Sequence, residues 1–145
     1  MKKTALILVM IVLPLFSGCK WVKDWFGTEK KEKFIEEKYV INIENEDEFK
    51  KNILDSKLPV VVKFETKWCG ICRSIALIYS ELAKKYNNEM KFATVNISKI
   101  GEIAKKYEIT GVPIFLFFKD GKIVGRIEGG VEVNVLENKI VEVLK

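Results

Sequence analysis

VVVKFETKWCGIC, residues 60–72, is the stretch that decides the fold of this chain. Its first five residues are apolar except for Lys63, which is typical of a strand inside a sheet. Cys69 and Cys72 stand two residues apart and can close a small disulfide ring with little movement of the backbone. A thiolate at Cys69 would also lie on the first turn of the helix expected next, where the helix dipole stabilises negative charge. The pair therefore indicates a redox site more than a structural crosslink.

Residues 1–18 predict a secretory signal peptide. Lys2 and Lys3 form a basic start, and Ala5–Leu13 is an uninterrupted apolar run. This run is too short for a membrane-spanning helix, which needs about 20 residues. The segment ends in Leu15-Phe16-Ser17-Gly18-Cys19, which resembles the lipobox of bacterial lipoproteins. That resemblance implies a diacylated Cys19 at the mature N-terminus, and the alternative is an ordinary cysteine in a leader that is retained or cut elsewhere.

Two segments follow the leader. Residues 19–38 are rich in Lys and Glu and lack a sustained apolar period, which predicts a solvated, membrane-proximal tether. The aromatic residues Trp21, Trp25 and Phe26 within it suit either a membrane interface or packing back onto the domain. Residues 39–145 are long enough for one domain with a single core.

Composition excludes several classes of function. The whole chain has a net charge of +5, and removal of Lys2 and Lys3 with the leader leaves about +3. That charge is weak and the lysines are interspersed with acidic residues, so we expect no nucleic-acid partner. The sequence contains no histidine, which excludes histidine bases and histidine-containing zinc sites. An exported protein also meets surroundings in which disulfides persist.

The remaining pattern predicts an α/β fold with the order β-α-β-α-β-α-β-β-α, a central mixed sheet flanked by helices. Helices are expected after the capping-box pattern Asn45-Glu46-Asp47-Glu48, from the cysteine motif to Leu82, over residues 102–107, and after a predicted N-cap at Asn134. Asp120-Gly121 predicts a two-residue hairpin turn. The expected strands are residues 39–43, 60–64, 92–97, 114–118 and 123–127.

This order, with Trp68-Cys69-Gly70-Ile71-Cys72 at the start of the second helix, resembles the compact thioredoxin family over residues 39–145. Three further features match that family. Gly111-Val112-Pro113 stands at its cis-proline loop, and Phe118-Lys119-Asp120-Gly121 stands at its hairpin. Gly129 matches the glycine that lines its substrate groove. The resemblance implies the thioredoxin-like fold and a redox-active dithiol.

The resemblance also implies roles for single residues. Cys69 would be the exposed attacking thiolate, and Cys72 would resolve the mixed disulfide and release the reduced partner. Val112 would offer backbone hydrogen bonds to an extended client segment. Pro113, if cis, would shape that edge and keep a backbone N–H away from the sulfurs. The implied groove consists of Trp68, Gly70, Ile71, Val112, Pro113 and Gly129. The alternatives are a core tryptophan, an ordinary turn proline and an ordinary loop glycine.

The sequence departs from the family beneath the cysteines. Lys63 stands where thioredoxins have a buried aspartate that helps to deprotonate the second cysteine, and Thr94 stands at the lysine that accompanies it. Glu65 replaces an aromatic residue on the same strand face as Lys63. Because a lone buried ammonium is costly, we expect Lys63 and Glu65 to form a displaced charge pair that tunes the redox site. A charged Lys63 would stabilise thiolate and a neutral one could accept a proton, whereas a lysine that reaches solvent would do neither.

Another departure concerns Ile71, which fills the position of a family proline. This position affects the redox potential strongly, so the family's potential does not carry over.

The sequence thus predicts a thiol–disulfide oxidoreductase that is lipid-anchored on the extracytoplasmic side of a bacterial membrane. Its partners would be disulfides or dithiols of exported proteins and an upstream thiol electron donor. We expect no metal and no cofactor beyond the redox-active disulfide, and reduction is the favoured direction. The alternatives are an oxidase that introduces disulfides, a non-catalytic client-binding protein, and a metal or iron–sulfur site shared between two chains.

Overall fold

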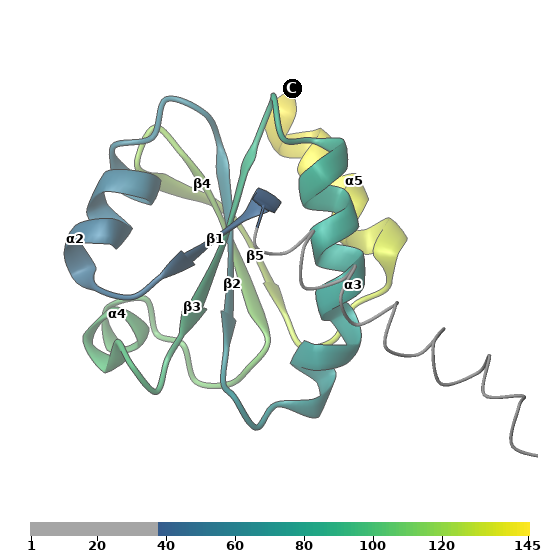
Figure 1. Ribbon diagram of the computed structural model, residues 1–145. Coiled ribbons are helices and arrows are strands. Elements are labelled where there is room, and N and C mark those ends of the chain that lie inside the picture. The colour runs from purple at the N-terminus through teal and green to yellow at the C-terminus, as the bar shows by residue number, and fades with distance from the viewer. Residues whose placement is uncertain (1–37) are drawn as a thin grey trace, which may run out of the picture. The chain divides into compact units, whose positions relative to one another are not determined.

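The apolar runs predicted as strands pair into one five-stranded mixed sheet (Figure 1). The computed structural model describes residues 38–145, so the predicted leader, Cys19 and the predicted tether up to residue 37 lie outside the described residues. The strand order is β1-β3-β2-β4-β5, with β1, β3 and β2 parallel and with β4 and β5 antiparallel to their neighbours. The strands are β1 (Val40–Ile43), β2 (Val60–Glu65), β3 (Lys91–Asn96), β4 (Ile114–Lys119) and β5 (Lys122–Glu128).

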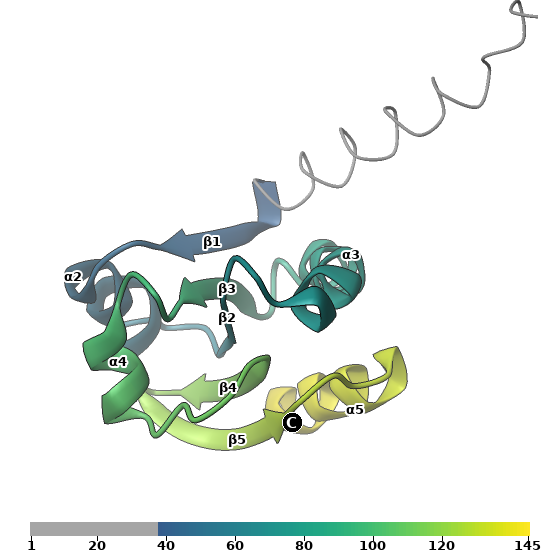
Figure 2. The same cartoon turned by 90° about the horizontal axis from the view of Figure 1, so that it is seen from below.

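Helices cover both faces of this sheet, as Figures 1 and 2 show from two directions. One face carries α3 (Gly70–Lys85) and α5 (Val133–Leu144). The other carries α2 (Glu46–Phe49), its π-helical continuation η1 (Lys50–Leu54), and α4 (Gly101–Lys106). The element order and the thioredoxin-like fold class predicted from the sequence are confirmed. Within residues 38–145 no helix combines the length and the apolar character needed to cross a membrane.

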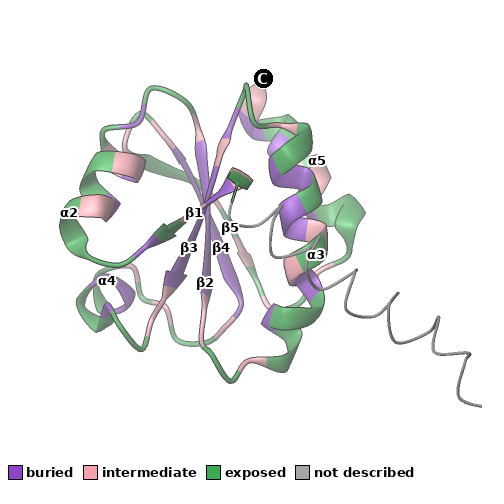
Figure 3. Cartoon of the chain, in the orientation of Figure 1, coloured by how far each residue is buried: buried purple, intermediate pink, exposed green. Residues whose placement is uncertain are grey.

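Two apolar cores lie on opposite faces of the sheet. Alternation along the central strands sends successive side chains to opposite cores, so that β2 contributes Val61 to the α3 side and Val62 to the α4 side. Strand β4 does the same with Phe117 and Phe118. Figure 3 shows the central strands buried along their length, in agreement with their nearly continuous apolar sequence. Burial on both faces therefore fixes which residues can occupy these strands.

The first helix begins as its sequence predicts. The Asn45 side chain accepts a hydrogen bond from the Glu48 backbone N–H at 2.9 Å. The Glu48 carboxylate in turn accepts one from the Glu44 N–H at 2.9 Å. The capping box is therefore present, with its returning bond displaced to the residue before the cap.

The prediction that Asn134 caps the last helix is wrong. Helix α5 begins at Val133, its N-cap is Glu132, and the Asn134 side chain accepts a hydrogen bond from the adjacent Val135 N–H. The extended backbone of Glu132 lets the chain enter the helix earlier. Burial of Leu136 and Ile140 sets the helix face without a side-chain cap. Val143 is buried in the last turn, and Leu144 is half-buried.

The predicted hairpin turn is confirmed at Asp120-Gly121, which joins β4 to β5. Both residues have positive φ, 52° and 72°, as the mirror-image turns of two-residue hairpins require. A Cβ on Gly121 would also lie 2.9 Å from the Leu54 carbonyl oxygen. This glycine is therefore needed both for its backbone conformation and for the close approach of the last residue of η1.

Candidate active site

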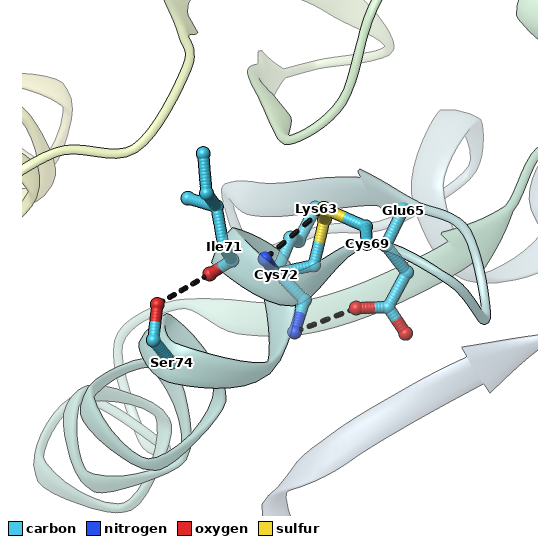
Figure 4. Close-up of a disulfide and its surroundings, with 6 residues drawn as sticks. All are labelled: Lys63, Glu65, Cys69, Ile71, Cys72 and Ser74. Atoms are coloured by element: carbon cyan, nitrogen blue, oxygen red, sulfur yellow. Dashed lines mark hydrogen bonds and ion pairs between the residues drawn. A yellow bond between two sulfur atoms is a disulfide. The ribbon is translucent and has the colours of Figure 1, made fainter.

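The loop after β2 delivers Cys69 to the N-terminus of α3. Cys69 is the N-cap residue, and its Sγ accepts a hydrogen bond from the Cys72 backbone N–H at 3.1 Å. Cys69 and Cys72 form a disulfide with 5.2 Å between their Cα atoms (Figure 4). The two sulfurs differ in access, because Cys72 is 2% exposed and Cys69 is half-buried. The more accessible sulfur thus lies where the helix dipole favours a thiolate.

Local hydrogen bonds hold this turn in place. The Cys69 N–H donates to the Thr66 carbonyl at 3.2 Å, and the Arg73 N–H donates to the Cys69 carbonyl at 3.3 Å. The Ser74 hydroxyl donates to the Ile71 carbonyl at 2.9 Å. The cysteine pair is therefore built into the first turn of a 16-residue helix.

An exposed apolar rim surrounds the disulfide. Trp68 is 82% exposed and Ile71 is 56% exposed, large fractions for side chains of this size. The Lys67 ammonium lies 5.5 Å from the Trp68 ring centroid. A core role for Trp68, one of the alternatives left open by the sequence, is excluded by this exposure.

The loops before β4 and after β5 complete the rim. The Val112–Pro113 peptide bond is cis, and the Gly129 N–H donates to the Pro113 carbonyl at 2.8 Å. Gly129 has a φ of 81°, a conformation that favours glycine. A Cβ on Gly130 would lie 2.6 Å from a methyl group of Ile71, so the start of α3 reaches this loop directly.

These contacts unite the predicted groove residues. Val112 is half-buried beside the buried Pro113, and Gly70 is exposed with open space where a Cβ would lie. The structure therefore brings the loops that carry Pro113 and Gly129 together and next to Ile71 of the cysteine motif, and the roles of the groove residues toward a client stay predictions.

The predicted Lys63–Glu65 ion pair is present, with 2.9 Å between Nζ and Oε2. Lys63 is 1% exposed, which excludes the alternative in which it stretches to solvent, and the Glu65 side chain is 27% exposed. Figure 4 shows both side chains in the surroundings of the disulfide. The Lys63 ammonium also lies 5.1 Å from the Tyr79 ring centroid. An effect of the pair on the redox chemistry stays a prediction.

Tyr79 is a site residue that the sequence analysis missed. Its hydroxyl lies 2.9 Å from the Val61 carbonyl and 2.8 Å from the Ala93 carbonyl, and thus joins α3 to both β2 and β3. The available signal was spacing, since residue 79 follows Cys72 by seven positions, or about two helical turns. The neighbouring Ile78 is half-buried.

Comparison with known proteins agrees with this geometry. Residues 40–142 match the Thioredoxin family. The chain belongs to the thioredoxin family. It is 36% identical to Thioredoxin 1 of Synechococcus elongatus over 92 residues, which are 63% of this chain and 86% of the relative. It is also 36% identical to Thioredoxin H-type of Oryza sativa subsp. indica over 110 residues, or 74% of this chain and 88% of the relative.

The protein is accordingly a thiol–disulfide oxidoreductase whose active-site disulfide is Cys69–Cys72. Membership of the thioredoxin family implies protein disulfides as substrates and a thiol as electron donor. The thioredoxin domain carries the whole redox centre on one helix terminus, and the charge pair of β2 lies beneath it.

Proposed function

We propose that this thioredoxin reduces disulfides of exported proteins while a lipidated Cys19 holds it on the extracytoplasmic side of a bacterial membrane. The observation that carries the catalytic part is the asymmetry of the disulfide, with Cys69 accessible at the start of α3 and Cys72 buried behind it. The lipobox-like ending of the leader supports the location.

The proposed reaction uses each cysteine once. In the dithiol form the Cys69 thiolate attacks one sulfur of the client disulfide, and the other client sulfur leaves as a thiolate. Cys72 then attacks the Cys69 sulfur, which closes the Cys69–Cys72 disulfide and releases the second client thiol. Two electrons pass to the client, and an upstream thiol donor returns them to the enzyme.

The rim around the disulfide would bind the client. Trp68, which precedes Cys69, and Ile71, which lies between the two cysteines in the sequence, offer exposed apolar surface. Val112 would present its backbone to an extended client segment, and Gly129 would allow that segment to approach closely. Extended apolar segments around accessible disulfides are thus the expected clients.

Trapping tests the catalytic proposal. In a Cys72→Ala variant the mixed disulfide formed by Cys69 has no resolving thiol, so covalent client adducts should accumulate and dissolve on addition of a reductant. A Cys69→Ala variant is the matched control and should form no adducts. Adducts that are absent from Cys72→Ala in an exported protein fraction would favour the passive client-binding alternative.

The direction of electron flow is tested by the reduction potential of the active-site disulfide. A value near about −270 mV would support a reductant, and one near about −120 mV an oxidant. The oxidase alternative is kept because of one observation, the buried Lys63 ammonium in place of the family's carboxylate. A cation near the sulfurs stabilises thiolates and makes a disulfide more oxidising.

The location has its own test. We propose residues 1–18 as the signal peptide, 19–38 as the tether and 39–145 as the thioredoxin domain. Metabolic labelling with a fatty acid should mark the wild type and leave Cys19→Ala unlabelled. Equal labelling of both proteins, or labelling of neither, would contradict the lipid anchor and leave the redox chemistry untouched.

A further inference from the structure

Lys63 is the one buried side chain with a formal charge among residues 38–145. An ammonium in this position is costly unless it is paired, and its carboxylate partner is Glu65 at 2.9 Å. Glu65 lies at the last position of β2 and is partly exposed, so the partner is at the solvent end of the pair. The charge pair therefore connects the interior beneath the disulfide with the surface.

The elements packed around Lys63 offer few other charges. Its neighbour on β3 is Thr94, whose hydroxyl donates to the Asn42 side chain on β1, and its neighbour on β4 is Phe115. The family's compensating lysine is thus replaced by a neutral group that is bonded elsewhere. The titratable side chains on the buried face of α3 are Cys72 and Tyr79, and the Tyr79 ring contacts the Lys63 ammonium.

Tyr79 gives the ammonium a fixed support. Its hydroxyl contacts carbonyls of two strands, which holds the ring, and the face of an aromatic ring attracts a cation. Cys72 lies two helical turns before Tyr79 on the same buried face of α3. In the disulfide its sulfur is neutral, and on reduction it becomes a thiol or a thiolate.

We propose that Lys63 is a counter-ion that changes partner with the redox state. With the disulfide closed, its ammonium is bound to Glu65. With the disulfide open, the ammonium is shared with a Cys72 thiolate, and Glu65 turns toward solvent as a carboxylate. Lys63 is thus a positioning residue that stabilises the reduced form. It acts as a cation that stabilises the Cys72 thiolate, whereas a buried carboxylate would act as a base that removes the thiol proton.

The step balances with glutathione as the thiol donor. Two glutathione thiols become one glutathione disulfide, the Cys69–Cys72 bond breaks, and two electrons pass to the two enzyme sulfurs. The two donor thiols also bring two protons, of which one goes to Cys69, or to solvent where Cys69 is the thiolate. If Cys72 were protonated, it would keep the other proton. If Lys63 holds Cys72 as a thiolate, that proton goes to solvent, and the equilibrium constant for reduction gains up to tenfold for each unit of increasing pH.

Two substitutions should therefore shift the equilibrium in opposite directions. Lys63→Met removes the cation, which destabilises the reduced form and lowers the equilibrium constant for reduction by about tenfold. Glu65→Gln leaves Lys63 without its carboxylate in the oxidised form, which raises the same constant. In the double variant the equilibrium constant for reduction should depend on pH less steeply than in the wild type. It should also lack the increase that Glu65→Gln causes alone.

The experiment measures the glutathione equilibrium constant of the mature protein between about pH 6 and pH 8, a range below the ordinary pKa of a free thiol. Lys99→Met is the matched control, because Lys99 forms an exposed ion pair with Glu44 and should change neither the constant nor its slope. Thermal unfolding of each oxidised variant shows that it is folded. Should Lys63→Met not fold, Glu65→Gln tests the proposal through the sign of its shift.

The counter-ion proposal is supported if Lys63→Met and Glu65→Gln shift the glutathione equilibrium constant in opposite directions and if the constant depends less steeply on pH in Lys63→Met. An unchanged constant and slope in Lys63→Met overturn it, as does a shift of both variants in the same direction or no shift in Glu65→Gln. The inference concerns the redox centre itself, so its failure leaves the proposed clients and lipid anchor standing. Failure of trapping or of labelling likewise leaves the glutathione measurement valid.

Discussion

Two glycines of this thioredoxin have left-handed backbones for different reasons. Gly121 lies in the β4–β5 turn, where a side chain would meet the Leu54 carbonyl. Gly129 lies beside the disulfide, where the space for a Cβ is open. The first glycine is required by the fold, and the second is proposed to leave room for a client segment.

Gly121→Ala should destabilise the protein by about 1–3 kcal/mol, through backbone strain and the contact with Leu54. Denaturant unfolding of the oxidised protein measures this loss. The glutathione equilibrium should not change, since β4 runs antiparallel to β2 and the turn therefore lies at the edge of the sheet where β2 begins, opposite the cysteines. An unfolding midpoint equal to that of the wild type would contradict the steric reading of this turn.

Gly129→Ala should slow the reduction of protein disulfides while leaving the glutathione equilibrium within error of the wild type. The added methyl group would occupy the space that an extended client needs, whereas glutathione reaches Cys69 without it. The backbone strain alone should cost about 1 kcal/mol. Reduction of protein disulfides by Gly129→Ala at the wild-type rate would show that Gly129 is not part of the client-binding groove.

At the residue scale, sequence reasoning found the groups with unusual chemistry. Cys69 and Cys72 were found because their spacing is specific, and the Lys63–Glu65 pair was expected because a lone buried charge is unstable. Tyr79 was not found. An aromatic residue on a helix satisfies an apolar pattern whether its hydroxyl is bonded or not, so the pattern carries no signal for its contacts with two strands.

At the scale of elements, cationic side chains of two strands cap the C-terminal ends of two helices. The Arg126 guanidinium of β5 donates to the carbonyls of Tyr107 at 3.1 Å and Glu108 at 2.9 Å, directly after α4. The Lys119 ammonium of β4 donates to the Val143 carbonyl at 3.0 Å in the last turn of α5. Both cations lie where helix ends present unpaired carbonyls.

Arg126→Met should lower stability by about 1–2 kcal/mol, because two carbonyl groups lose a charged donor. The loop that leads to the cis Pro113 follows Glu108, so hydrogen exchange in residues 107–112 should also become faster. Lys122→Met on the same strand is the control and should have little effect. Unchanged hydrogen exchange in residues 107–112 would show that the hydrogen bonds from Arg126 are not needed to hold this loop.

A polar contact joins α3 to α5 at the end away from the disulfide. The Lys85 ammonium and the Tyr86 hydroxyl both donate to the Glu137 carboxylate. The hydrogen bond from Lys85 lowers the pKa of Glu137 below its ordinary value of 4.5, and the same bond raises the pKa of Lys85. The contact therefore contributes stability only while Glu137 is ionised.

Glu137→Gln should lower the melting temperature at pH 7. The folded pKa of Glu137 is depressed, so its stabilisation is complete above the unfolded value and is lost as the pH falls through the folded value. The difference between variant and wild type should therefore shrink at about pH 3. The effect should be small, because exposed ion pairs are screened by solvent. A difference that persists in acid would point to lost packing instead of lost charge.

The elements themselves were largely predictable, and their ends were less so. The five strands were found within about two residues because buried strands require continuous apolar runs. The prediction of Asn134 as the N-cap was wrong because α5 already begins after Glu132, whose backbone is extended. No capping side chain marks this earlier start in the sequence. The π-helical turn η1 was not foreseen, since Phe49 and Ile53 are buried equally well by the pattern of an α-helix.

At the scale of the whole molecule, the strand order β1-β3-β2-β4-β5 was not specified by the sequence pattern alone. That pattern gave the number and sequence of elements and their class. The pairing of distant strands depends on how the two cores close, and only the family resemblance carried that information. The groove follows from this topology, because its residues lie up to 61 positions apart in the chain, from Trp68 to Gly129.

The register of β1 has a consequence for where the enzyme can work. Val40 pairs with Phe92 and Lys91 pairs with Val60, so the chain enters the sheet at the edge where β2 begins, whereas Cys69 follows the edge where β2 ends. Under the proposed lipid anchor, the predicted tether of residues 19–38, 20 residues in all, would span at most about 70 Å even if fully extended. In that arrangement the domain could reach clients only within this distance of Cys19, and its cysteines follow the edge of the sheet opposite the one where the chain enters. Clients within about 70 Å of the anchor would meet a high local concentration of dithiol, and clients farther away would meet none.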